Sequence, residues 1–168
     1  MLLYPVRKNN SGFTLIEVIV VTIIVGIIAA ISVPNFFSLL QRNRVTEALS
    51  SIEGALREGQ KQAERDGSGC DLTIDTANDL VSGGCLLNTR TLTNNVELYS
   101  NVGTLSFSAK GTASAATLPA VMVVQMFNGE GTDTRRCLII NSLGIIKTGD
   151  FTADPSDAGN LVQGNCDS

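Results

Sequence analysis

The chain has 168 residues, which is enough for one folded domain and one further segment. It carries a net charge of −4 and contains neither histidine nor tryptophan. An acidic chain gives no electrostatic support for general nucleic-acid binding, and a chain without histidine lacks the commonest general base and metal ligand.

A short basic segment opens the chain and precedes a long apolar run. Arg7 and Lys8 are the only charged residues among the first 12, and Val18–Val33 contains no charged residue. As a helix, Phe13–Val33 would be roughly 30 Å long, which matches the hydrocarbon core of a bilayer. Positive charge in front of such a run keeps that end in the cytoplasm, so we expect the remainder of the chain to be exported.

Glu17 is the one side chain that does not fit a membrane span. A carboxylate in the apolar zone costs roughly 2.5–3.5 kcal/mol, so such a residue usually has a partner or a function unless it stays hydrated at the interface. A cleaved signal peptide and a simple signal anchor are the two ordinary interpretations of the segment. Ile31–Phe37 offers no convincing small-x-small cleavage site, and a helical pattern continues directly beyond it.

The stretch Gly12-Phe13-Thr14-Leu15-Ile16-Glu17 resembles the prepilin peptidase motif of type IV pilins and of the pseudopilins of type II secretion. The long apolar run and Pro34 near its end complete the likeness. The resemblance implies cleavage after Gly12 and N-methylation of Phe13. It implies that the apolar segment first anchors the chain and later forms a fibre core, where Glu17 pairs with the Phe13 amine of a neighbouring subunit.

The helix is expected to run from Thr14 to Asp66 and to change character on the way. Pro34 should kink it or open it locally, and Gly26 either bends it or allows close packing. The turn signal Gly67-Ser68-Gly69 ends it. Apolar residues at three- and four-residue spacing in its second half predict a buried stripe, made of Val45, Ala48, Leu49, Ile52, Ala55, Leu56 and Ala63.

Beyond the helix, turn signals separate short stretches of strand character. Val121–Val124 is a continuous apolar run and predicts a central strand, and Leu143-Gly144 predicts a tight hairpin turn. The expected fold is α+β, with one antiparallel sheet packed on the C-terminal half of the long helix. The candidate strands are Asp71–Ile74, Val96–Tyr99, Thr104–Ala109, Ala120–Phe127, Arg136–Ile140 and Ile145–Thr148.

Four cysteines after the apolar run favour disulfides in an oxidising compartment, and four allow three pairings. Neighbour pairing would join Cys70 to Cys85 and Cys137 to Cys166, each bridge contributing roughly 3 kcal/mol in the chain-entropy model. Zinc is disfavoured because the chain has no Cys-x-x-Cys and no histidine. We expect no cofactor and no metal. A calcium site is the alternative interpretation of the tail carboxylates Asp150, Asp154 and Asp157.

The segment 136–147 resembles the C-terminal hairpin of the minor pseudopilin H family and its pilus relatives. Some of these carry Gly-Arg-x-Arg after the turn, a motif linked to DNA binding, whereas this chain has Gly144-Ile145-Ile146-Lys147. Arg135, Arg136 and Lys147 would contact a few phosphates at most. After residue 12 the chain has 10 positive and 16 negative side chains, a net charge of −6, so we do not favour a DNA partner.

No enzyme motif is found, and we expect no catalytic activity. The resemblance implies a cleaved leader over 1–12, a transmembrane and fibre-core helix over 13–35 and an exported α+β domain over 36–168. The chain would be a minor pilin or pseudopilin, anchored once in the bacterial inner membrane with its domain in the periplasm. Implied partners are prepilin peptidase, other pilin subunits, an inner-membrane platform protein and a cytoplasmic assembly ATPase. The alternatives are a DNA-binding or adhesive pilus-tip pilin and an anchored protein that never polymerises.

Overall fold

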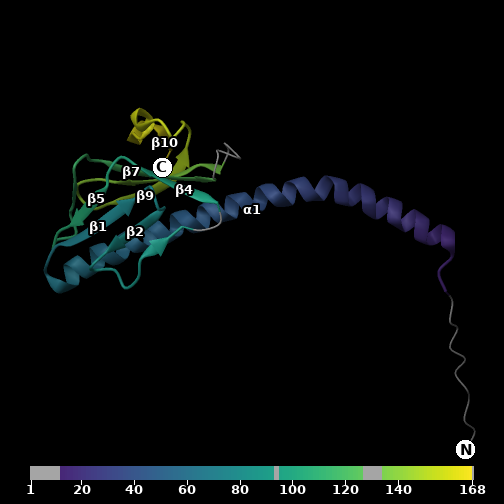
Figure 1. The fold of residues 1–168 in the computed structure, drawn as a ribbon, viewed down its shortest axis with the longest axis horizontal. Helices are drawn as coiled ribbons and strands as arrows, with labels where there is room; N and C mark the ends of the chain where they lie inside the picture. The colour runs from purple at the N-terminus through teal and green to yellow at the C-terminus, as the bar shows by residue number, and fades with distance from the viewer. Residues whose placement is uncertain (1–11, 93–94, 127–133, 168) are drawn as a thin grey trace, which may run out of the picture. The chain divides into compact units, whose positions relative to one another are not determined.

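The computed structural model describes residues 12–92, 95–126 and 134–167, with the side chains of residues 33–35 left out. The chain divides into two units, Met1–Phe37 and Ser38–Ser168, and each is treated by itself. Helix α1 spans Leu15–Asp66 and contributes to both units (Figure 1). The predicted helix is therefore confirmed, with its first residue one position later than expected.

The end of α1 lies where the glycine signal placed it. Asp66 is its last residue, and Gly67 follows with a φ of +62°, in the left-handed region. A residue without a Cβ adopts that conformation at no steric cost, which is why glycine so often follows the last helical turn.

The predicted stripe on the second half of α1 is buried, with every one of its seven residues no more than 8% exposed. It packs into one core with apolar side chains from the strands that follow. Arg57 and Glu53, one turn apart, pair on the solvent side at 2.7 Å. The amphipathic pattern thus orients this half of the helix.

Two antiparallel sheets cover the helix instead of the single sheet predicted. The first has the order β3-β2-β1-β5-β6, built from Arg90–Thr91, Leu80–Gly83, Cys70–Asp75, Thr104–Phe107 and Ala113–Ala115. The second has the order β10-β9-β8-β7-β4, built from Cys166–Asp167, Ile146–Phe151, Arg136–Ile140, Ala120–Met126 and Val96–Ser100. Short 3-10 turns at Ala158–Asn160 and Gln163–Asn165 precede β10.

The chain changes sheet between β4 and β5, at Asn101. The Asn101 side chain accepts a hydrogen bond from Val121 N–H at 2.8 Å and donates to the Pro119 carbonyl at 3.2 Å. These bonds tie the crossing to the start of β7, where the chain returns to the second sheet. A side-chain bond of this kind leaves no periodic signal, so the sequence pattern alone predicted one sheet.

All six candidate strands are present, and every end lies within three residues of the predicted one, with Arg136–Ile140 matched at both ends. Ala109 lies beyond the end of β5, Ile145 precedes β9, and Phe127 falls outside the described residues. Four further strands escaped prediction, namely β2, β3, β6 and β10. Each has two to four residues, too few to show alternation.

Strand β7 is buried along its whole length, as predicted for a central strand. Met122 and Val124 belong to the core against α1, whereas Val121 and Val123 belong to a second core. The C-terminal tail, yellow in Figure 1, supplies Leu161 and Cys166 to that second core. The second sheet is therefore covered by the helix on one face and by the tail on the other.

Gly144 marks the point where both sheets and the helix meet. The Gln60 side-chain amide donates to the carbonyls of Gly111 at 2.8 Å and Gly144 at 3.2 Å, and Ala113 N–H donates to Ser142 at 3.1 Å. Gly144 has a φ of +76°, and a Cβ at this position would collide with the Gly111 carbonyl oxygen. The predicted hairpin turn is confirmed, and the close approach explains its glycine.

We expect Gly144→Ala to destabilise the domain by about 2–4 kcal/mol, the sum of left-handed strain and backbone overpacking. Urea unfolding of residues 38–168 measures the loss. Gly103→Ala is the matched control, because an added Cβ there meets nothing within 4 Å. Equal stability of the two variants would show that the junction tolerates a side chain.

Candidate processing and assembly site

The predicted processing point lies in a non-helical stretch in front of α1. Gly12, Phe13 and Thr14 have no regular secondary structure, and the Phe13 residue is 82% exposed. The peptide bond between Gly12 and Phe13 therefore precedes the first helical residue, Leu15. An accessible bond outside the helix is one that a peptidase can reach.

Thr14 and Glu17 cap the start of α1 reciprocally. Glu17 N–H donates to the Thr14 hydroxyl at 3.3 Å, and Thr14 N–H donates to Glu17 Oε2 at 3.4 Å. This is a capping box, in which two otherwise unpaired backbone donors of the first turn find side-chain acceptors. The carboxylate also lies at the positive end of the helix dipole, which stabilises its charge.

Thr14 is a helix-capping residue that the sequence interpretation did not include. The signal was present, since Thr-x-x-Glu directly before an apolar run is a helix-start signature. Glu17 therefore has a local capping role in addition to the expected partner in other subunits. The structure gives the carboxylate a partner within its own chain.

The apolar segment after the cap is exposed on every side within its unit. Large apolar side chains from Phe13 to Ile31 are 44–82% exposed. By length and composition α1 is able to cross a membrane, with a mean hydropathy of 2.8 in its most apolar window. A Cβ added at Gly26 meets nothing within 4 Å. Pro34 lies within the bounds of α1, but its side chain is outside the described residues, so the predicted kink stays a prediction.

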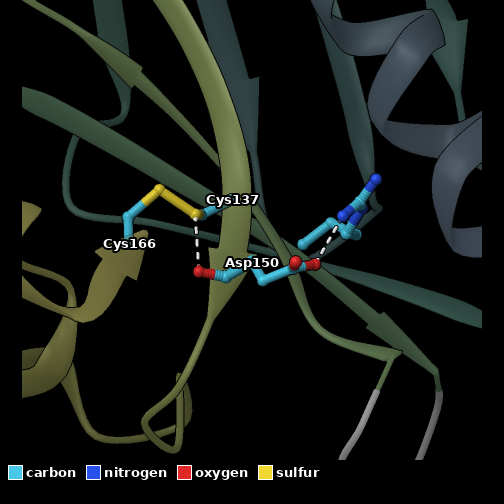
Figure 2. A network of polar contacts seen from close by, with 4 residues as sticks. Cys137, Asp150 and Cys166 are labelled. Carbon is cyan, nitrogen blue, oxygen red and sulfur yellow. Dashed lines mark hydrogen bonds and ion pairs between the residues drawn. A yellow bond between two sulfur atoms is a disulfide. The ribbon is translucent and has the colours of Figure 1, made fainter. Parts of the chain in front are cut away.

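Both disulfides join neighbouring cysteines, Cys70 to Cys85 and Cys137 to Cys166. The second bridge fixes the tail to β8, and the Cys137 sulfur lies 3.4 Å from the Asp150 carbonyl oxygen (Figure 2). These are the neighbour pairings considered from the sequence.

The tail carboxylates do not converge on a common point. Asp150 pairs with Arg136 (Figure 2), Asp154 accepts bonds from Ser156, and Asp157 caps the turn at Ala158–Asn160. The hydrogen bonds from Ser156 lower the pKa of Asp154. Among the described residues no group of three or more metal-binding side chains is found.

The three cations of the predicted basic cluster do not share one face of the second sheet. Arg136 stands opposite Asp150 on the helix side of the second sheet, and Lys147 stands opposite Ile139 on the tail side. Arg135 donates to Gln125 at 3.1 Å and to the Ala153 carbonyl at 2.8 Å. Arg136 and Lys147 therefore lie on different faces of the sheet, and Asp150 partly neutralises the charge of Arg136.

Arg135 completes a polar network on the tail side of the second sheet. The Gln125 side-chain amide donates to the Tyr99 hydroxyl at 3.3 Å, and that hydroxyl donates to Glu97 at 2.9 Å. Burial, together with the hydrogen bond to Glu97, raises the pKa of Tyr99. The Arg135 guanidinium thus holds the sheet to the tail and is not presented to solvent as a free cation.

Replacing Thr14 should loosen the first turn of α1. Thr14→Val removes the hydroxyl at nearly constant volume, and losing a cap costs about 1 kcal/mol, or roughly fivefold in amide exchange at Glu17. Thr14→Ser keeps the hydroxyl and should exchange like the parent. Hydrogen exchange of the full chain in detergent micelles measures both, and equal rates in the two variants would contradict the capping role.

Comparison with known proteins matches the N-terminal segment to one family model. Residues 7–33 match the model described as the prokaryotic N-terminal methylation motif. The type IV major pilin protein PilA of Myxococcus xanthus is 44% identical over 55 residues, which cover 33% of this chain and 24% of that protein. The type IV major fimbrial protein FimA of Dichelobacter nodosus is 34% identical over 85 residues, or 46% of this chain and 51% of that protein.

A protein of a secretion system is also similar to this chain. The type II secretion system core protein G of Pseudomonas aeruginosa is 47% identical over 47 residues, which cover 28% of this chain and 33% of that protein. The chain thus spans between about a quarter and a half of the length of these relatives.

Two solved structures share the fold of the domain. The type IV minor pilin FimU of Pseudomonas aeruginosa aligns with a TM-score of 0.53 at 20% identity, over 65% of this chain and 90% of that one. The minor pseudopilin EpsH of Vibrio cholerae aligns with a TM-score of 0.52 at 14% identity, over 62% and 95%. The motif, the relatives and the fold thus all resemble the pilin-like family, which comprises the type IV pilins and the type II secretion pseudopilins.

Proposed function

We propose that the chain is a minor pilin or pseudopilin, a structural subunit that assembles into a type IV pilus or a type II secretion pseudopilus. Cleavage after Gly12 and methylation of Phe13 would prepare it for assembly. The observation that carries the proposal is the methylation motif over residues 7–33, set directly in front of an apolar helix with exposed side chains.

The exposed apolar segment needs an apolar environment in each state of the protein. Burying one large aliphatic side chain is worth about 1.5–3 kcal/mol, so a run of this length would not stay in water. A bilayer provides the first environment, and the equivalent helices of other subunits provide the second. The proposed divisions are a leader over 1–12, this helix over 13–35 and an exported domain over 36–168.

The capping box is compatible with a second partner for Glu17. Oε2 accepts the bond from Thr14, and Oε1 accepts none from the described residues. In the mature protein the free oxygen would meet the Phe13 amine of a neighbouring subunit, and the pair would neutralise both charges in the fibre core. The local cap would hold the carboxylate in place for that contact.

Location and partners follow from the same proposal. The two disulfides fit an oxidising compartment, so the domain would lie in the periplasm with the apolar helix in the inner membrane. Prepilin peptidase would process the chain, and a platform protein with a cytoplasmic ATPase would drive its assembly with other subunits. Catalysis by the chain itself is not part of the proposal.

DNA uptake gains no support from the hairpin that suggested it. Lys147 lies on the face opposite to Arg136, and Arg135 is engaged with Gln125 and Ala153. The hairpin tip instead exposes Leu143 and Ile145, which are 67% and 50% exposed. An apolar tip is suited to contact with protein, and we retain the structural function as the proposal.

We expect Glu17→Leu to leave the protein in the membrane but to lower its incorporation into fibres by about tenfold or more. Removing one partner of a buried ion pair costs roughly 3–5 kcal/mol, because the Phe13 amine then stays unpaired in an apolar core. Quantitative immunoblotting of sheared fibres against membranes measures the ratio. Glu47→Leu, at an exposed position of the same helix, is the control. Normal incorporation of Glu17→Leu would overturn the assigned role.

A further inference from the structure

A polar hollow lies between α1 and the β8–β9 hairpin, within the unit Ser38–Ser168. Its volume is about 340 Å³, and it is lined by Arg42, Thr46, Thr134, Arg136 and Asp150. Arg42 and Thr46 lie one turn apart on α1, so their side chains share a helix face. The described part of the lining therefore consists of two guanidinium groups, two hydroxyls and one carboxylate.

The charges of this hollow favour an anion. Arg42 forms no hydrogen bond or ion pair with any described residue, and its side chain is exposed. Arg136 pairs with Asp150, but this pair is open to solvent, with the side chains 38% and 70% exposed. An exposed pair is worth little, so it offers weak competition to a second anion. Among the described residues the lining carries a net charge of +1, which fits a ligand with one negative charge.

The chemistry of the lining selects oxygen-rich anions. Guanidinium groups bind phosphate oxygens in a bidentate manner, and hydroxyls add single hydrogen bonds. A phosphodiester carries one negative charge and two free oxygens, enough to bridge Arg42 and Arg136. The hollow thus matches a phosphodiester better than a dianion.

Arg42 of the hollow is also close in sequence to the end of the apolar run. Leu39 is still apolar and 53% exposed, and Arg42 follows it by three residues, a rise of about 4.5 Å along a helix. Arg42 is also the first charged residue after the apolar segment, so it is the charged group of the domain nearest in sequence to the proposed membrane span. Arg44 adds a second cation two residues later, and Glu47 is the first acidic residue after the apolar segment.

We propose that this hollow binds the phosphodiester of an acidic phospholipid, with Arg42 and Arg136 as its charged ligands and Thr46 as a hydroxyl donor. Bound lipid would hold the domain against the membrane surface until the subunit leaves the bilayer. The proposal depends on the proposed anchoring only for the position of the bilayer. Its test does not depend on cleavage at Gly12, so the two proposals fail independently.

Native mass spectrometry of the full chain, released from zwitterionic micelles, tests the site with phosphatidylglycerol and phosphatidylcholine as probes. We expect more adduct with phosphatidylglycerol, and a loss of roughly fivefold in Arg42→Gln and in Arg136→Gln. Arg65→Gln, an exposed cation in the last turn of the same helix, is the matched control and should bind like the parent. Equal adducts of the two lipids, or an equal loss in the control, would overturn the proposal.

Removing the competing carboxylate gives a test in the opposite direction. Asp150→Asn frees Arg136 and should increase the phosphatidylglycerol adduct, which a variant that merely fails to fold would not do. Asp71→Asn, on the exposed side of the first sheet, is its control and should change nothing. Inorganic phosphate separates the two sources of the anion. If phosphate shifts the side-chain NMR signals of Arg42 and Arg136 as strongly as the lipid does, the lipid assignment is wrong.

Discussion

The burial of one face of α1 is the interaction on which the rest of the structure depends. Between Val45 and Ala63 that face is closed off by strands from both sheets, so the sheets share a single core against the helix. The first half of the same helix has no such preference, because it is apolar on all sides. A helix of that kind is stable in lipid or among other helices, and it does not select one face. One helix thus joins a folded domain to a segment that is stable both in lipid and among other helices.

Much of this fold could be predicted, because the helix and the central strand have strong periodic signals. The stripe from Val45 to Ala63 and the run Val121–Val124 are long enough for their apolar patterns to predict that they are buried. The division into two sheets could not be predicted, since it depends on side-chain bonds of Asn101 and on strands of two to four residues. Gly144 was recognised as a turn residue, but its contact with Gly111 joins segments far apart in sequence.

The candidate site was predictable to the extent that it is local. Gly12, Phe13 and Glu17 form a linear motif. The capping role of Thr14 is predictable from the same stretch, because Thr-x-x-Glu is a helix-start pattern. The basic cluster could not be judged from the sequence, because register decides the face on which each charge lies. In the register of β8 and β9, Lys147 lies opposite Ile139 and Asp150 lies opposite Arg136. Lys147 and Asp150 are three residues apart, an odd number, so Lys147 and Arg136 lie on opposite faces of the sheet. The hollow beside Arg42 is lined by residues that are far apart in sequence, from α1 and from the segment of β8 and β9, so no local pattern predicts it.

The central claim is that the chain is processed as a pilin before it acts, and intact-mass and peptide mass spectrometry of the N-terminus test it most directly. The protein would be recovered from the membranes of cells that contain a prepilin peptidase. The account predicts that the chain begins at Phe13 and that this residue carries a methyl group on its amine. A chain that still begins at Met1 in those cells, with no product cut after Gly12, would contradict it.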